Sequence, residues 1–169
     1  IKPRILKSFL LFCTKKTAKK VIYVSEYLAK KEHLNIPSTV VYNSLEDSFY
    51  EKAINFYPSH SFTLNILMLC SLKKYKGVFQ FIKLAKHCPK HQFTLVLNAE
   101  QHQIDSFFEK HQVPQNVTLF PKQKNVHPFY QNSHVVVNLS RPDEWIETFG
   151  LTAIEAMAYG IPMITPPVG

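Results

Sequence analysis

Apolar and polar positions alternate along most of the chain in a way that predicts strands followed by helices. The run at 64–70 is continuously apolar, which is typical of a parallel strand buried on both faces. Further strands are predicted at 93–97, 117–120, 134–139 and 161–165, and helical spacing of apolar residues predicts helices at 78–87, 103–110 and 125–132. Strands and helices joined by short connections predict an α/β fold with a Rossmann-like, doubly wound parallel sheet, in which ligands bind at the carboxyl ends of the strands.

The first sixty residues are less regular. A helix is predicted over 5–20, followed by a short strand at 21–24. Ser25 is a good N-cap for a helix that runs to residue 31, and another strand is predicted at 38–42. The segment 46–62 has aromatic residues but no clear period, so we interpret it as a linker with some helix.

The stretch from Ser140 to Pro162 contains the strongest local signals. Small and apolar residues after Gly150 predict a short buried helix, which Gly160 can end and Pro162 prevents from continuing. Because Gly150 has no Cβ, a ligand can approach its backbone closely. The helix N-terminus offers unpaired N–H groups and a positive dipole end, and both favour an anion such as phosphate.

Two carboxylates, Glu147 and Glu155, flank this predicted anion site, with seven residues between them. Carboxylates accept hydrogen bonds from paired hydroxyls, as on a ribose or a sugar. An alternative is that the two glutamates are the acid/base pair of a hydrolase. In one unbroken helix they would lie about 12 Å apart, whereas the two carboxylates of glycosidases lie roughly 5–10 Å apart. The glycine turn could shorten the distance, so distance alone does not exclude this alternative. A second alternative is that Thr152 and Glu155 form a capping box, and the spacing alone does not decide.

A cluster of lysines, at positions 73, 74 and 76, lies between the first long strand and the helix at 78–87. Cations at a helix N-terminus face the positive end of the dipole, so an anion bound among them would explain their placement. Ordinary solvated loop lysines are the simpler explanation.

The formal net charge is +8, and it is concentrated at the N-terminus. Nine of the twenty basic residues precede position 32, where Glu26 is the one acid: Lys2, Arg4, Lys7, Lys15, Lys16, Lys19, Lys20, Lys30 and Lys31. Interleaved apolar residues make a basic amphipathic helix, which is compatible with an anionic membrane surface, with nucleic acid or with a plain solvated face. The odd number of cysteines, three, fits a reducing compartment.

Several other chemistries lack their motifs. There is no Gly-x-Gly-x-x-Gly dinucleotide fingerprint, no Walker-type Gly-Lys-Ser/Thr and no serine-hydrolase elbow. His87, Cys88 and His91 are close in sequence but do not have a zinc-site spacing.

The run from Glu147 through Phe149-Gly150 to Glu155-Ala-Met-Ala-Tyr-Gly160-Ile-Pro162 resembles the signature of retaining glycosyltransferases of family 4, which have the GT-B fold. The resemblance implies the C-terminal, donor-binding half of such an enzyme, like those that build bacterial capsular and other surface polysaccharides. It divides the chain into the tail of an N-terminal domain with its linker, 1–60, and a donor-binding domain, 61–169. Because the family continues beyond Gly169, we expect an incomplete domain. Because the family's acceptor site lies in its N-terminal half, we expect this chain to bind the donor nucleotide weakly and to be inactive in isolation.

The resemblance also implies roles for individual residues. Glu147 and Lys76 are expected to be catalytic, with Glu147 holding the donor sugar and Lys76 neutralising the departing diphosphate. Cys70-Ser71 stand where the family carries Gly-Arg, so Lys73 or Lys74 is expected to replace that arginine as a phosphate contact. The other expected donor-binding residues, which present backbone N–H groups, hold the ribose or lie near the base, are Phe149, Gly150, Leu151, Glu155, Phe120 and Lys122.

The implied co-substrate is a UDP- or GDP-linked sugar, transferred with retention to a glycan or lipid-linked acceptor without a metal or resident cofactor. No nucleic-acid partner is expected. The implied location is the cytoplasm, with peripheral attachment to the inner face of the plasma membrane compatible with the basic helix. The rival interpretations are a non-enzymatic nucleotide-binding Rossmann-like module and a basic nucleic-acid-binding domain.

Overall fold

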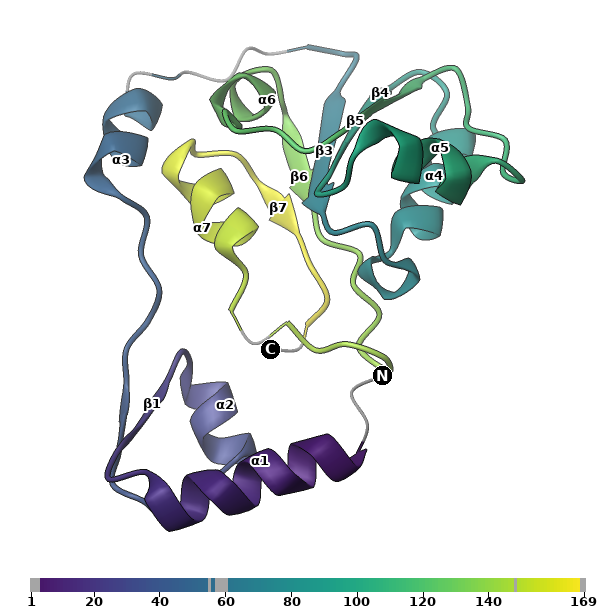
Figure 1. The fold of residues 1–169 in the computed structure, drawn as a ribbon. Coiled ribbons are helices and arrows are strands. Elements are labelled where there is room, and N and C mark those ends of the chain that lie inside the picture. The colour runs from purple at the N-terminus through teal and green to yellow at the C-terminus, as the bar shows by residue number, and fades with distance from the viewer. Residues whose placement is uncertain (1–3, 55, 57–60, 148, 168–169) are drawn as a thin grey trace. The chain divides into compact units, whose positions relative to one another are not determined.

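The computed structural model describes residues 4–54, 56, 61–147 and 149–167, and it divides the chain into two compact units, 1–43 and 44–168 (Figure 1). The expected linker at 46–62 includes residues 55 and 57–60, which lie outside the described residues. Its first part forms helix α3 (Asp47–Ala53), which belongs to the second unit. A domain boundary at residue 60 stays a prediction.

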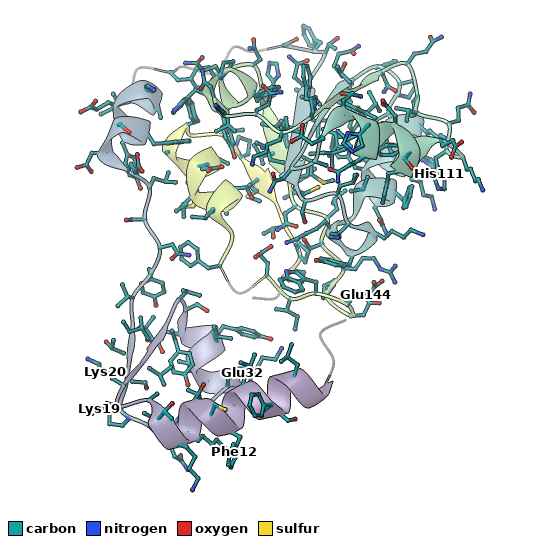
Figure 2. All side chains as sticks on the ribbon, viewed as in Figure 1. Phe12, Lys19, Lys20, Glu32, His111 and Glu144 are labelled. Atoms are coloured by element: carbon teal, nitrogen blue, oxygen red, sulfur yellow. The ribbon has the colours of Figure 1, made fainter. Side chains whose placement is uncertain are left out.

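The first unit consists of helix α1 (Arg4–Thr17), strand β1 (Val21–Tyr23), helix α2 (Glu26–Lys31) and strand β2 (Ser38–Val40). The two strands pair in parallel. Ser25 caps α2 as predicted, since its hydroxyl oxygen accepts a hydrogen bond from the backbone N–H of Leu28 at 3.2 Å. Phe12, labelled in Figure 2, lies on α1 with 59% of its surface exposed. Among the described residues, no helix combines the length and the apolar character needed to cross a bilayer.

The second unit is built on a five-stranded parallel sheet in the order β5-β4-β3-β6-β7. The strands are β3 (Asn65–Cys70), β4 (Gln92–Leu97), β5 (Val117–Phe120), β6 (Val135–Val137) and β7 (Met163–Ile164). Within this sheet the chain passes first through the central strand β3, then outward through β4 and β5, and then crosses back to β6. The strand order therefore reverses between β3 and β6, and this is the position at which doubly wound sheets form a ligand crevice.

Helices cover both faces of this sheet (Figure 1), which confirms the predicted doubly wound α/β architecture. Alternate residues of β3 face opposite sides: Met68 packs with α4 (Val78–His87) and α5 (Gln101–Phe108), whereas Leu67 packs with the other helices. Those on the second face are α3, α6 (His127–Gln131) and α7 (Leu151–Ala158). Both clusters are almost fully buried, so the sheet provides a rigid platform for the loops at its carboxyl edge.

The predicted elements are all present, with ends that differ by a few residues. The helix at 78–87 and the strand at 117–120 have the predicted bounds. The strand predicted at 134–139 is shorter than expected, because β6 ends at Val137 and Asn138 already begins a turn: its side-chain Oδ1 accepts a hydrogen bond from the backbone N–H of Ser140. This early turn directs residues 138–140 toward the carboxyl edge of the sheet.

Candidate functional site

A pocket of about 260 Å³ lies at the carboxyl ends of β3 and β6, at the point where the strand order reverses. We call it the β3–β6 pocket. Its lining comes from the end of β3, from the short 3₁₀ turn η1 (Lys74–Lys76), from the turn after β6 and from the start of α7. The lining residues are Met68, Leu69, Cys70, Ser71, Lys76, Asn138, Ser140, Glu147, Phe149, Gly150, Leu151 and Thr152. The position agrees with the binding edge expected for this topology.

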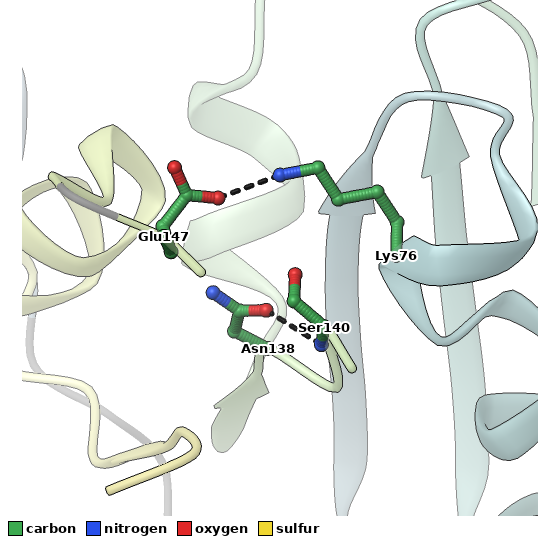
Figure 3. A network of polar contacts seen from close by, with 4 residues as sticks. All are labelled: Lys76, Asn138, Ser140 and Glu147. Atoms are coloured by element: carbon green, nitrogen blue, oxygen red, sulfur yellow. Dashed lines mark hydrogen bonds and ion pairs between the residues drawn. The ribbon is translucent and has the colours of Figure 1, made fainter. Parts of the chain in front are cut away.

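Lys76 and Glu147 point toward each other across this pocket (Figure 3). The Lys76 Nζ lies 2.6 Å from the Glu147 Oε2, and the two side chains keep 16% and 29% of their exposure. Lys76 Nζ also lies 5.4 Å from the centroid of the Trp145 ring, which stacks on Tyr75. The pocket thus brings together the two residues expected to be catalytic, 71 positions apart in sequence, as a half-buried ion pair.

Gly77 fixes the place of Lys76. Its φ of +81° lies in the left-handed region, and a Cβ added there would come within 2.1 Å of the Leu139 carbonyl oxygen. Next to this contact, the backbone N–H of Arg141 donates to the Tyr75 carbonyl at 2.8 Å. The η1 turn and the turn after β6 are therefore packed backbone against backbone, which is possible because residue 77 is glycine.

The N-terminus of α7 forms another wall of the pocket, as predicted for Phe149, Gly150 and Leu151. Gly150 is the N-cap and Leu151 the first helical residue, so the N–H groups of Leu151 and Thr152 have no partner inside the helix, whereas that of Ala153 donates to the Gly150 carbonyl at 3.0 Å. Gly150 has a φ of −91°, which other residues adopt as well, and an added Cβ would lie 3.6–3.7 Å from Ala153 and Glu147. Its lack of a Cβ therefore keeps the pocket wall open rather than permitting an unusual backbone conformation.

The C-terminal end of α7 lies just before Gly160, as predicted. Gly160 has a φ of +64°, the backbone N–H of Ile161 donates to the Ala156 carbonyl, and that of Gly160 donates to the Met157 carbonyl. These two bonds are those of a Schellman motif, which ends the helix at this glycine.

Glu155 does not form the capping box that was one interpretation of its spacing. It lies in the second turn of α7, and its Oε2 accepts a hydrogen bond from the Tyr130 hydroxyl at 2.5 Å. Burial, together with the neighbouring Glu155 carboxylate, raises the pKa of Tyr130 well above its usual value, so this hydroxyl remains a donor. Glu155 is half-buried and does not line the β3–β6 pocket.

A second hollow of about 410 Å³ adjoins the first, and we call it the β3–β4 pocket. The two share Leu69, Cys70, Ser71 and Thr152, and the second extends over the ends of β4 and β5. Lys122, which was expected to lie near the base of the nucleotide, lines this second pocket. The lining residues are Leu69, Cys70, Ser71, Val96, Leu97, Asn98, Lys122, Gln123, Val126 and Thr152. Glu155 follows Thr152 by one helical turn on α7.

Three expected donor-binding residues lie elsewhere. Lys73 and Lys74 are exposed and line neither pocket, because the η1 turn directs Lys76 inward and its neighbours outward. Phe120 also lines neither pocket; its ring packs edge-on against Phe129 in the core beneath α6. Cys70 lines both pockets, and burial raises the pKa of its thiol to about 12 although Lys76 opposes the shift.

Sequence reasoning did not select four polar residues that line the β3–β6 pocket: Ser71, Asn138, Ser140 and Thr152. Each follows a strand or opens a helix, so the rule that ligands bind at the carboxyl edge could have drawn attention to them. Among the described residues, no three His, Cys, Asp or Glu side chains are grouped so that they could hold a metal ion.

Comparison with known proteins gives a consistent result. The family described as "Glycosyl transferases group 1" matches residues 52–169. No curated protein sequence matches the chain. Among solved structures, a glycosyltransferase from Rickettsia africae superposes with a TM-score of 0.71 at 19% identity, over 99% of this chain and 49% of that one.

Two further similar structures contain ligands. Alr3699/HepE of Anabaena, in complex with UDP and glucose, gives a TM-score of 0.73 at 17% identity over 96% of this chain and 48% of that one. The pneumococcal O-GlcNAc transferase GtfA, in complex with UDP and GlcNAc, gives 0.60 at 18% identity over 95% of this chain and 32% of that one. The chain spans about half the length of the first two structures, and at these identities the likeness concerns the fold alone.

Proposed function

Because the chain belongs to the glycosyl transferases group 1 family, with the α/β architecture of a GT-B half, we propose that its second unit binds a nucleotide-sugar donor in the two adjoining pockets. The observation that carries the proposal is the β3–β6 pocket itself, where a cation, a carboxylate and a helix N-terminus converge at the switch point of the sheet. The complexes of similar structures with UDP and a sugar support the same class of ligand.

The arrangement suits a sugar diphosphate. Lys76 and the free N–H groups at the start of α7 supply positive charge where the diphosphate would sit, and they would stabilise the charge that develops on it as it departs. Glu147 offers acceptor oxygens to sugar hydroxyls on the opposite wall. The positive charge of these protein groups also supports our proposal that neither a metal nor a resident cofactor takes part.

The β3–β4 pocket is the proposed place of the nucleoside. Lys122 lines it, and Glu155 lies one helical turn beyond Thr152, so we place the base near Lys122 and the ribose near Glu155. Glu155 can keep its bond to Tyr130 through one oxygen and accept a ribose hydroxyl with the other. In this arrangement Lys73, Lys74 and Phe120 make no direct contact with the donor.

For the whole protein, we propose retaining transfer of the sugar to a hydroxyl of a glycan or lipid-linked acceptor in bacterial surface-polysaccharide synthesis, on the cytoplasmic side. The first unit favours attachment to an anionic membrane surface, because α1 has exposed apolar residues next to lysines. Its exposed apolar residues are Leu6, Phe9, Leu10 and Phe12. Sedimentation with anionic vesicles, against neutral ones, tests this part.

Calorimetry tests donor binding directly. We expect UDP or GDP to bind the chain, a short DNA duplex not to bind at physiological salt, and UDP affinity to be the same with and without EDTA. Lys76→Ala should weaken the diphosphate far more than the nucleoside, because the lost charge faces phosphate. Equal losses for both ligands, or binding of the duplex alone, would contradict the proposal.

A further inference from the structure

Ser140 has a buried hydroxyl without a protein partner. The residue is 4% exposed, and among the described residues nothing hydrogen-bonds its Oγ. Its backbone N–H is bound to the Asn138 Oδ1 at 3.0 Å, which holds the turn after β6 in place. The side chain is therefore fixed by its own turn while its polar atom remains available.

The other buried serines differ. The Ser133 hydroxyl, 5% exposed as a residue, donates to the Phe129 carbonyl at 2.6 Å, and the Ser25 hydroxyl caps α2. Neither lines the β3–β6 pocket, whereas Ser140 does. An unpaired buried hydroxyl costs free energy, so a site that retains one calls for an explanation in terms of a ligand.

The direction of the hydroxyl identifies what it could contact. Figure 3 shows the Ser140 oxygen pointing toward the space between Lys76 and Glu147. A hydroxyl can donate to a phosphate oxygen, and a phosphate at this point would gain the Lys76 charge at the same time. Glu147 repels phosphate and favours hydroxyls, so the sugar belongs on its side of the pocket.

We propose that Ser140 is a donor-binding residue whose hydroxyl donates a hydrogen bond to a phosphate oxygen of the nucleotide sugar, beside Lys76. This inference rests on the proposed function. It adds a neutral donor to the charged groups, and a neutral donor holds the phosphate in one orientation without strengthening the binding of every anion. In this way Ser71 and the turn after β6 together offer polar groups to the phosphates of the donor.

The test compares Ser140→Ala with the matched variant Ser133→Ala, using UDP, GDP and UDP-glucose in calorimetry and a thermal melt of each protein. Ser140→Ala should bind the diphosphate about tenfold more weakly, the size typical of a hydrogen bond to a charged group, with a melting temperature that does not fall. Ser133→Ala should show the reverse, because its hydroxyl has a structural partner: a lower melting temperature and unchanged affinity.

Each other outcome overturns the inference. Unchanged diphosphate affinity in Ser140→Ala, with binding intact in the unaltered chain, refutes the role of Ser140 and leaves the proposed function standing. A loss confined to UDP-glucose places the hydroxyl on the sugar and refutes the phosphate contact. If the unaltered chain binds none of the three ligands, the proposed function and this inference fail together.

Discussion

Removing the charge of Glu147 should strengthen the binding of a free nucleoside diphosphate. In the structure the Glu147 carboxylate forms an ion pair with Lys76, the cation proposed to bind the diphosphate, and its Oε2 lies 2.6 Å from the Lys76 Nζ. Binding of a phosphate must weaken this pair or share the lysine with it. Glu147→Gln keeps the size of the side chain and removes the competing charge, so Lys76 becomes free to serve the ligand.

The size of the effect follows from the burial of the pair. At 2.6 Å the direct attraction is about 6 kcal/mol in an effective dielectric constant of about 20. Desolvation of two side chains that keep 16% and 29% of their exposure offsets most of it, and a net value of about 1 kcal/mol is reasonable for such a pair. Glu147→Gln should therefore bind UDP or GDP about fivefold more tightly. The affinity for UDP-glucose should increase less, because the substitution also removes the carboxylate that accepts hydrogen bonds from the sugar hydroxyls.

Trp145 provides the assay. It is the one tryptophan of the chain, and its ring lies 5.4 Å from the Lys76 Nζ, so its fluorescence should respond when a ligand draws the lysine away. Titrations with UDP and UDP-glucose, checked by calorimetry, give the two affinities. Glu144→Gln is the matched control, because Glu144 lies on the same loop but pairs with Arg141 at 2.6 Å outside the pocket, and its affinity for UDP should not change. A Glu147→Gln protein that binds UDP no better than the unaltered chain would refute the competition between carboxylate and phosphate.

Three further predictions concern stability. Gly77→Ala should lower the free energy of unfolding, measured in urea, by about 3 kcal/mol or more, because it adds a backbone clash to a left-handed φ, whereas Gly160→Ala, which meets open space, should cost only about 1 kcal/mol. Glu155→Ala should cost about 1–3 kcal/mol in the same assay, because it leaves the buried Tyr130 hydroxyl unpaired, and Glu155→Gln should recover most of this loss. In the folded chain the pKa of His127 is lowered from 6.5, mainly by burial and then by Lys52 on α3. The free energy of unfolding that this group contributes is therefore present above pH 6.5 and should be lost as the pH falls through the lowered pKa. The loss should be smaller in His127→Gln.

Each of these has an outcome that contradicts it. Equal losses for the two glycine variants would show that the contact with Leu139 is not what Gly77 provides. If Glu155→Gln were as unstable as Glu155→Ala, the bond from Tyr130 would not be the reason for the loss. A pH profile identical in His127→Gln and the unaltered chain would exclude His127 as the titrating group.

The fold was readable from the sequence because its signals are local. A continuous apolar run is enough to identify β3, and helical spacing is enough to identify α4. The side-chain partners depend on contacts between distant segments, and no spacing encodes those. The bond from Tyr130 to Glu155 joins residues 25 apart, so the spacing left a capping box as an equal alternative. The packing of Phe120 against Phe129 was likewise not predicted, because the sequence does not say which face of β5 meets α6.

The Lys-Gly pair at 76–77 shows how packing and binding are joined in this site. In the sequence, this glycine directly follows the lysine cluster for which a bound anion was one explanation. In the structure its missing Cβ admits the Leu139 carbonyl, and the adjacent Arg141 N–H reaches Tyr75 across the same contact. Because Lys76 precedes that glycine and Ser140 follows that leucine, one backbone contact places both side chains in the same pocket. A substitution that separated the two turns would therefore displace the charged and the neutral donor together, which explains why the site depends on a glycine that lines no part of the pocket.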